Sequence, residues 1–221
     1  MVYGRQSPRP RRRQGVPGAA SLEAFEPRTL MSVAGMGPDT VAYLPFDPTP
    51  AGMRLNPAQY TAAAAADLIN LDDFRADPRF SWADGTGYAA VVLDTGIDRD
   101  HPFFGEDANH NGVADRIVYS YDFADNDSDA SDNDDHGSNV SSIIGSSDPT
   151  FTGMAPAVNL IHLKVFKDDG LARDKDIKRA LRWVVTNARR FNVASVNMSL
   201  GGEEFYNSFT RGPYSDELQD L

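Results

Sequence analysis

Asp94 stands directly after the apolar run from Tyr88 to Leu93. In open α/β sheets, functional residues gather just beyond the carboxyl ends of the strands, so a carboxylate at this position is suited to chemistry. It could accept a phosphoryl group, orient a histidine, or cap the turn after the strand, which is the commonest role of a lone aspartate. The phosphoryl role is the weakest, because Gly96 occupies the place where a phosphatase carries a second aspartate.

His136 is the second candidate, within Asp135-His136-Gly137-Ser138-Asn139-Val140. A loop enters a helix at this point, which holds an imidazole in a fixed orientation, and Gly137 lets another stretch of backbone approach closely. A lone histidine is more often an ordinary surface or core residue than a catalyst. The order Asp then His, however, matches one type of catalytic triad, in which the aspartate holds the imidazole tautomer and the histidine deprotonates a serine.

A third segment runs from Val193 into Ser199-Leu200-Gly201-Gly202. Its first half is apolar enough for a buried strand, and the residues that follow expose backbone just past the edge of a sheet. Exposed backbone of this kind can pair with an extended peptide, which is the strand-addition mode of recognition. Without the first two segments, this one would be an ordinary strand and turn.

Between Asp94 and His136 lies an acidic insert, residues 106–135, with ten acidic residues and one arginine. The plain interpretation is a solvated acidic loop. Within it, however, residues 107–115 space oxygen ligands at positions 1, 3, 5 and 9 around a glycine at position 6, as the front of an EF-hand loop does. Val118 stands where the bidentate acid belongs, so a further ligand would have to come from elsewhere, such as Asp122, Asp125 or Asp127. We expect a structural Ca²⁺ here, bound by Asp107, Asn109, Asn111, the backbone carbonyl of Val113, and Asp115.

These residues need a scaffold, and four apolar runs predict its strands: Tyr88 to Leu93, Ile117 to Phe123, Val158 to Phe166 and Val193 to Met198. The first run is continuously apolar, which is typical of a strand buried on both faces. An amphipathic helix with a cap at Asp174 and an apolar stripe from Ile177 separates the last two. The alternation of strands and helices predicts an α/β fold with a doubly wound, mainly parallel sheet.

Shorter helices are predicted in three further places. One starts near Ala62, one carries the apolar face Val140, Ile143 and Ile144, and one begins within Ser215 to Leu221. The segment 38–56 is rich in proline and is predicted to be an extended connector.

The composition excludes several classes of protein. With 41% hydrophobic residues the chain can build a core, yet no run approaches the length of a membrane span. The absence of cysteine rules out disulfides and thiolate chemistry. Residues 1–30 hold six arginines and two glutamates, a net charge of +4, so the remainder of a chain with net charge −11 carries −15. Such an acidic body repels phosphate backbones, which argues against nucleic-acid binding.

Taken together and in this order, the segments resemble the subtilase family of serine proteases. The resemblance extends over residues 57–221 and rests on four blocks: Gly85 to Asp98, Asp135 to Gly145, Gly153 to Val165, and Val196 to Gly202. It implies a subtilisin-like fold in which Asp94 and His136 belong to an Asp–His–Ser charge relay. It also implies that Ser199, Leu200 and Gly201 line the substrate cleft and that the substrates of the family are proteins or peptides, and we expect a monomer.

Residues 1–56 are predicted to be a disordered leader and linker ahead of this domain. Within them, the stretch from Leu22 to Ser32, with Phe-Glu-Pro-Arg at its centre, resembles a short motif near the N-terminus of many planctomycete surface and secreted proteins. A Pro-containing turn is the alternative. Together with the family resemblance, the motif implies secretion or a place at the cell surface.

The chain departs from the family in one mild and one serious respect. Ser138 and Asn139 replace a usual threonine and a frequent second histidine, neither of which performs chemistry in the family. The nucleophile block, Gly-Thr-Ser-x-Ala-x-Pro, and the oxyanion-stabilising asparagine before it are absent from the 221 residues. We therefore expect a sheet that is incomplete at its C-terminal side and a chain that is inactive alone, as a fragment or truncated gene product. The alternative is a non-catalytic, calcium-binding surface module derived from a subtilase.

Overall fold

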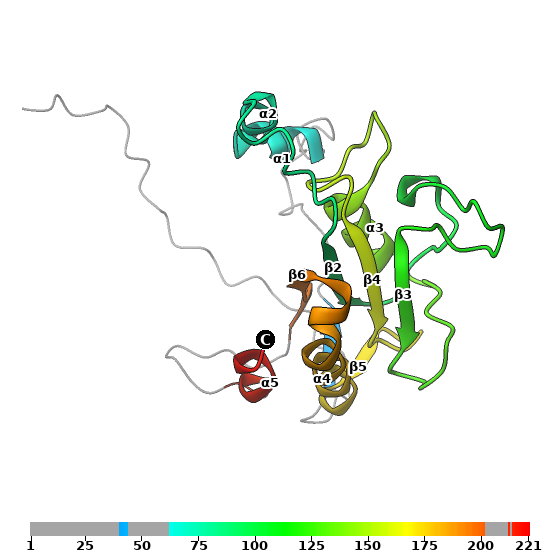
Figure 1. Ribbon diagram of the computed structural model, residues 1–221. Coiled ribbons are helices and arrows are strands. Elements are labelled where there is room, and N and C mark those ends of the chain that lie inside the picture. Colours follow the sequence, from blue (N-terminus) through cyan, green and yellow to red (C-terminus); the bar gives the residue numbers. More distant parts are fainter. Residues whose placement is uncertain (1–39, 44–61, 202–211, 213) are drawn as a thin grey trace, which may run out of the picture. The chain divides into compact units, whose positions relative to one another are not determined.

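The structure is a computed structural model, and it describes residues 40–43, 62–201, 212 and 214–221 (Figure 1). These residues all belong to the second of two units into which the chain divides, residues 33–221. The Phe-Glu-Pro-Arg motif and most of the predicted leader and linker lie outside the described residues.

A four-stranded parallel sheet is the centre of the fold, with the order β3-β4-β2-β6 (Figure 1). Its strands are β2 (Ala89–Asp94), β3 (Ile117–Asp122), β4 (Asn159–Lys164) and β6 (Val193–Asn197). All four lie within the runs predicted from the sequence or extend them by one residue. Every residue of β2 is buried, because β4 and β6 flank it and both of its faces are covered.

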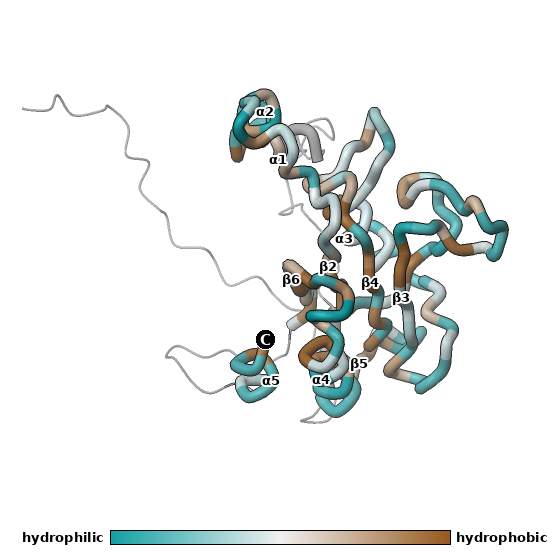
Figure 2. The backbone as a smooth tube through the Cα atoms, viewed as in Figure 1, coloured by the Kyte–Doolittle hydropathy of each residue, from teal (hydrophilic) through white to brown (hydrophobic). Residues whose placement is uncertain are grey.

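Two hydrophobic cores lie on opposite faces of this sheet. On one face, Ala89, Val91 and Leu93 pack with the apolar stripe of α4 (Asp174–Phe191). On the other, Ala90 packs with Leu160, and Ile144 of α3 (His136–Gly145) lies against the same cluster. Figure 2 shows apolar residues along the sheet strands and hydrophilic residues along much of α4. The predicted doubly wound, mainly parallel α/β fold is therefore confirmed.

Helix α4 begins at Asp174, but the predicted cap is wrong. The N-cap residue is Arg173, and it makes no side-chain capping hydrogen bond. Asp174 already has a helical backbone, and its carboxylate instead accepts a hydrogen bond from the hydroxyl of Tyr214 at 2.5 Å. Tyr214 directly precedes α5 (Ser215–Gln219), the short helix predicted near the end of the sequence.

The apolar face predicted for α3 is wrong in part, because Ile144 packs against the core but Ile143 does not. Its buried residues are Gly137, Ser141 and Gly145, whereas Ile143 is 45% exposed. A Cβ atom built on Gly145 would lie 3.1 Å from Cγ1 of Val158, which is tighter than an ordinary van der Waals contact. The helix approaches the sheet so closely that small residues, four apart, have to form its inner face.

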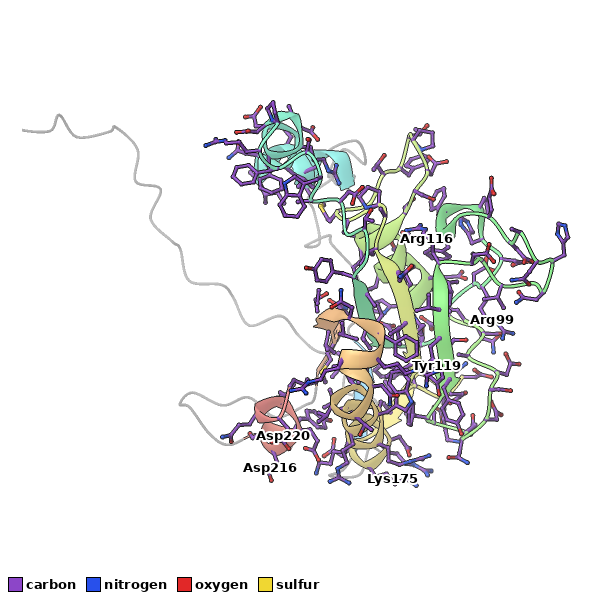
Figure 3. All side chains as sticks on the ribbon, in the orientation of Figure 1. Arg99, Arg116, Tyr119, Lys175, Asp216 and Asp220 are labelled. Atoms are coloured by element: carbon purple, nitrogen blue, oxygen red, sulfur yellow. The ribbon has the colours of Figure 1, made fainter. Side chains whose placement is uncertain are left out.

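Arg116, just before β3, joins three segments through the backbone (Figure 3). Its guanidinium donates to five carbonyl oxygens: Phe103 and Phe104 of η2 (Pro102–Phe104), Gly145 at the end of α3, Pro156 and Val158. Burial lowers the pKa of Arg116. The five donors of a guanidinium are matched by five acceptors, which satisfies a half-buried charge without a carboxylate.

The predicted helix near Ala62 is present as α1 (Ala62–Leu68). The sequence analysis missed α2 (Leu71–Ala76). Arg75 of α2 donates hydrogen bonds to the carbonyls of Gly153 at 2.7 Å and Met154 at 3.0 Å, so α2 is fixed to the loop before β4.

A second, three-stranded sheet has the order β5-β1-β7. Its central strand, β1 (Thr40–Tyr43), runs antiparallel to both β5 (Leu171–Arg173) and β7 (Leu200–Gly201). Strand β1 falls within the predicted extended connector, and no pattern in the sequence indicated that it would pair.

Strand β6 is less buried than predicted. Ala194 and Ser195 are exposed, and the other three residues are partly buried. Among the described residues, β6 is an edge strand that pairs only with β2, so solvent reaches positions that a further strand or helix would cover.

Candidate functional site

The site is built where β2 ends and α3 begins. Asp94 is the last residue of β2, and His136 is the first residue of α3. Their side chains meet, with Nδ1 of His136 2.7 Å from Oδ1 of Asp94. The two residues are 42 positions apart in the sequence, and the tertiary structure brings them together as the resemblance implies.

The carboxylate of Asp94 is fully buried, whereas the side chain of His136 retains 14% exposure. Oδ1 of Asp94 also accepts the backbone N–H of Thr95 at 2.8 Å. The pKa of His136 is raised, first by the hydrogen bond to Asp94 and further by the charges of Asp94, Asp134 and Asp132, while burial opposes the shift. The pair therefore combines a fixed carboxylate with an imidazole that holds its proton more strongly than usual.

Backbone packing holds the two segments in register. A Cβ atom on Gly137 would lie 2.2 Å from the carbonyl oxygen of Gly96, so no other residue fits at position 137 without movement of the backbone. The N–H of Gly137 donates to Oγ1 of Thr95 at 2.9 Å. The close approach predicted for Gly137 is confirmed, and its partner is the turn after Asp94.

Lys164 lies beside Asp94 in the sheet and was missed by the sequence analysis. It pairs in register with Asp94 on β2 and with Asp122 on β3. Its buried side chain donates to the carbonyl of Ser131 at 3.0 Å and to Asp168 at 2.9 Å. Lys164 stands at the end of an apolar run, as many ordinary strand-terminal residues do, so the sequence contained no sign of these contacts.

A second histidine, His162 on β4, lies against α3 and was also missed. It is fully buried, and its Nδ1 is 3.2 Å from Oγ of Ser141. Burial lowers its pKa to about 4, although Asp94 and Asp132 act in the opposite direction. Within the described part of the chain, Nε2 of His162 and Oδ2 of Asp94 are the buried side-chain atoms without a hydrogen-bond partner.

The predicted substrate-binding residues lie in and beside β7. Leu200 and Gly201 form this strand and pair with Tyr43 and Ala42 of β1. Ser199 precedes it, and its Oγ accepts a hydrogen bond from the side-chain amide of Asn197 at 2.9 Å. The edge predicted to receive an extended peptide thus receives a strand of this same chain.

The predicted calcium ligands lie in one loop. The carboxylate of Asp107 accepts the N–H groups of Asn111 at 3.1 Å and Gly112 at 2.8 Å, and Nδ2 of Asn109 donates to Asp115 at 3.1 Å. Gly112 has φ +79°, the left-handed conformation that the turn requires. The described residues contain no group of three or more His, Cys, Asp or Glu side chains that could hold a metal ion, so a cation here would need amide and backbone oxygens in addition to the carboxylates of Asp107 and Asp115.

No helix among the described residues is long and apolar enough to cross a membrane.

Comparison with known proteins identifies the family of the chain. Residues 85–219 match the profile of the subtilase family, peptidase family S8. The chain is 41% identical over 119 residues to alkaline serine exoprotease A of Vibrio alginolyticus, which covers 54% of this chain and 20% of the relative. It is 34% identical over 121 residues to the subtilisin-like serine protease AsES of Sarocladium strictum, covering 53% of this chain and 27% of the relative. The chain thus spans less than a third of the length of these curated relatives.

Among solved structures, a cold-adapted subtilisin-like serine proteinase is similar at 34% identity with a TM-score of 0.48, covering 62% of this chain and 43% of that one. The family profile covers more than half of the chain, from the turn before β2 to the end of α5. The chain is a member of the subtilase family.

Proposed function

We propose that this chain supplies the aspartate and the histidine of a subtilisin-type serine endopeptidase. The observation that carries the proposal is the 2.7 Å contact between Nδ1 of His136 and Oδ1 of Asp94. With its proton on Nδ1, the imidazole donates to the carboxylate, and Nε2 becomes the nitrogen that takes the proton of a serine hydroxyl. Asp94 then stabilises the imidazolium that forms, and His136 returns the proton to the leaving amine.

The nucleophile of this relay is not among the 221 residues. After Gly202 the only serines are Ser208 and Ser215, and neither stands in a Gly-Thr-Ser-x-Ala block. In subtilisin, a member of the same family, loss of the serine lowers kcat by about 10⁶. We therefore expect the chain alone to be inactive on peptides. Turnover of a fluorogenic peptide by the purified chain, abolished by His136→Ala, would contradict this expectation.

The proposed activity is tested by translating the DNA beyond the Leu221 codon in all three frames. A Gly-Thr-Ser-x-Ala block would identify the rest of the protease, which can then be expressed and assayed. In that enzyme, we expect His136→Ala to lower kcat by about 10⁶ and Asp94→Asn by about 10⁴, because the triad acts as a unit. Clean absence of the block, together with soluble expression of the chain as it stands, would favour the non-catalytic module.

The three-stranded sheet supports a peptide-binding role. Ala42 of β1 pairs with Leu171 of β5 on one side and with Gly201 of β7 on the other. Two strands that hold an extended segment between them provide the geometry of strand addition, in which the main chain supplies the affinity. We propose that β5 and β7 form the two walls of the substrate site, and that a peptide has to displace β1 to enter it.

The variant Ala42→Pro tests this site, because proline removes a backbone donor and is not tolerated in a central strand. We expect the variant to bind a fluorescent peptide of residues 38–45 at least about tenfold more tightly than the unaltered chain, by removing its competitor. Ala42→Val, which keeps the donor and suits a strand, is the matched control. Equal binding by all three proteins would exclude β1 as an occupant of the site.

A structural Ca²⁺ in the loop 107–115 is a third proposal. The loop offers carboxylates from Asp107 and Asp115, amide oxygens from Asn109 and Asn111, and the carbonyl of Val113, which is the ligand class that Ca²⁺ prefers. Added Ca²⁺ should raise the melting temperature, and Asp107→Asn should reduce that gain. Because calcium binding without proteolysis is what the alternative module requires, an unchanged melting temperature would count against both the site and the module.

Secretion or surface attachment, and a monomeric state, complete the proposed function. The support for export is the resemblance of the segment from Leu22 to Ser32 to a motif of planctomycete secreted proteins. Detection of the protein in the culture medium or on intact cells, and size-exclusion chromatography of the purified chain, test the two statements.

A further inference from the structure

Asp132 lies four residues before His136, in the loop that leads into α3, and its carboxylate is fully engaged. Oδ1 accepts from Oγ1 of Thr95 at 2.9 Å and from the N–H groups of Asp134 and Asp135, each at 3.1 Å. Oδ2 accepts from the N–H of Ser138 at 2.8 Å and from its hydroxyl at 2.6 Å. One half-buried carboxylate therefore takes five hydrogen bonds from both segments that carry the site.

The N-cap residue of α3 makes no side-chain capping hydrogen bond, so the first N–H groups of the helix need acceptors from elsewhere, and Asp132 is one of them. The N-cap residue is Asp135, with φ 72°, and its side chain makes no capping hydrogen bond. The first-turn N–H groups of Gly137 and Ser138 find their acceptors in Thr95 and Asp132 instead. The first turn of the helix is thus capped by the turn that follows Asp94, with Asp132 between the two.

Ser138 extends the same connection. Its Oγ donates to Asp132 and accepts the N–H of Asp98 at 2.9 Å. Both hydrogen bonds need only a hydroxyl at position 138, so the serine found here can make them in place of the threonine that is usual in the family. Gly96 fits against the same loop so closely that a Cβ atom on it would lie 2.4 Å from the carbonyl oxygen of Ser131.

We propose that Asp132 is a positioning residue that fixes the imidazole of His136 against Asp94 by joining the turn after β2 to the first turn of α3. It acts through Thr95 and Ser138, and its charge adds to the field that favours the protonated imidazole. The proposal rests on the role assigned to His136 above. Its test measures the Asp94–His136 pair itself, so a negative result is separate from the question of whether the protein cleaves peptides.

The test compares Asp132→Asn with Asp148→Asn in the full chain by NMR of the imidazole nitrogens. Asp148 is a matched control, because its carboxylate also accepts two backbone N–H groups, from Thr150 and Phe151, each at 2.8 Å, but in a loop beyond the end of α3.

In Asp132→Asn, the side-chain NH2 group of the asparagine would face N–H or O–H groups that need an acceptor. We expect a lower pKa of His136, a loss of the single Nδ1–H tautomer, and amide exchange of Ser138 faster by about tenfold or more, the equivalent of one charge-assisted hydrogen bond. We expect Asp148→Asn to change none of these.

Because the charge of Asp132 by itself raises the pKa of His136, the Nδ1–H tautomer is the quantity that an aspartate acting by charge or by stability alone would leave unchanged. If Asp132→Asn and Asp148→Asn give the same His136 titration, Asp132 does not position the imidazole. Should Asp132→Asn fail to fold, Thr95→Val removes the hydroxyl that links Asp132 to Gly137, and Thr95→Ser restores it. A lowered pKa of His136 in Thr95→Val that returns in Thr95→Ser supports the proposal, and an unchanged titration in both overturns it.

Discussion

Two histidines lie on either side of Gly137, and their environments differ in one decisive respect. His136 meets a carboxylate at the rim of the sheet, and its pKa is raised. His162 meets only a serine hydroxyl inside the fold, and burial lowers its pKa to about 4. The same side chain is therefore prepared to carry a proton at one position and to remain neutral at the other. Asp94 and Asp132 act on both histidines, so the direct hydrogen bond to a carboxylate accounts for the raised pKa of His136, and burial for the lowered pKa of His162.

The residue shared by both environments gives the largest expected effect. In Gly137→Ala, the new methyl group would lie 2.2 Å from the carbonyl of Gly96 and 3.0 Å from Cε1 of His162. Since the first of these neighbours is backbone, we expect a loss of about 3 kcal/mol in the free energy of unfolding, at the upper end of overpacking. Urea denaturation measures it.

Gly145→Ala on the same helix is the control, because its methyl group would meet only the side chains of Val158 and Leu160, which can move. We expect this variant to lose about 1 kcal/mol. Equal losses in the two variants would show that the backbone contact at Gly137 is not rigid.

The second prediction concerns His162 and acid. Its pKa in the folded chain lies below the ordinary value of 6.5, so the unfolded chain binds the proton first as the pH falls. Stability should decrease between pH 6.5 and about 4, by up to roughly 3 kcal/mol, and this contribution should be constant above and below that window. Asp94 and Asp132 reduce the effect and Lys164 increases it.

Urea denaturation at pH 7 and pH 4.5 measures this loss in the unaltered chain and in His162→Leu. The variant should lose less stability between the two pH values than the unaltered chain does. His110→Asn, at an exposed position in the loop 107–115, should retain the full pH dependence. An identical pH dependence in His162→Leu and in the unaltered chain would contradict the proposed titration.

The smallest expected effect is the opposite dependence at His136. Because the pKa of His136 is raised in the folded chain, the pairing with Asp94 contributes stability that is fully present below pH 6.5 and is lost as the pH rises through the folded pKa. The difference in unfolding free energy between the unaltered chain and His136→Gln should therefore be larger at pH 6 than at pH 9. We expect this change to be smaller than that at His162, because His136 is partly exposed. A difference that grows toward pH 9 would reverse the comparison between the two histidines.

Most of the scaffold could be predicted from local pattern. The continuous apolar run before Asp94 and the stripe from Ile177 identified β2 and α4, because burial on two faces and on one face leave different periodicities. The inner face of α3 could not be predicted in this way. Small residues at Gly137, Ser141 and Gly145 carry no hydrophobic signal, and their use follows from how closely the helix approaches the sheet.

The candidate site, too, could be predicted from the sequence only in part. Asp94 and His136 could be named because each stands at a recognisable junction of strand, loop and helix. Asp132 could not be distinguished from the nine other acidic residues between positions 106 and 135. Its role depends on five donors that converge on it from separate segments, and convergence of this kind is not a property of spacing.

The sequence by itself determined the family, the alternation of strands and helices, and the two residues of the proposed relay, because each follows from residue type and local order. Only the tertiary structure decided which aspartate caps α3, which histidine remains neutral, and which segment lies between β5 and β7. These outcomes depend on distances between residues far apart in the chain. Hydrogen bonding, burial and strand pairing act through such distances, and spacing along the sequence does not record them.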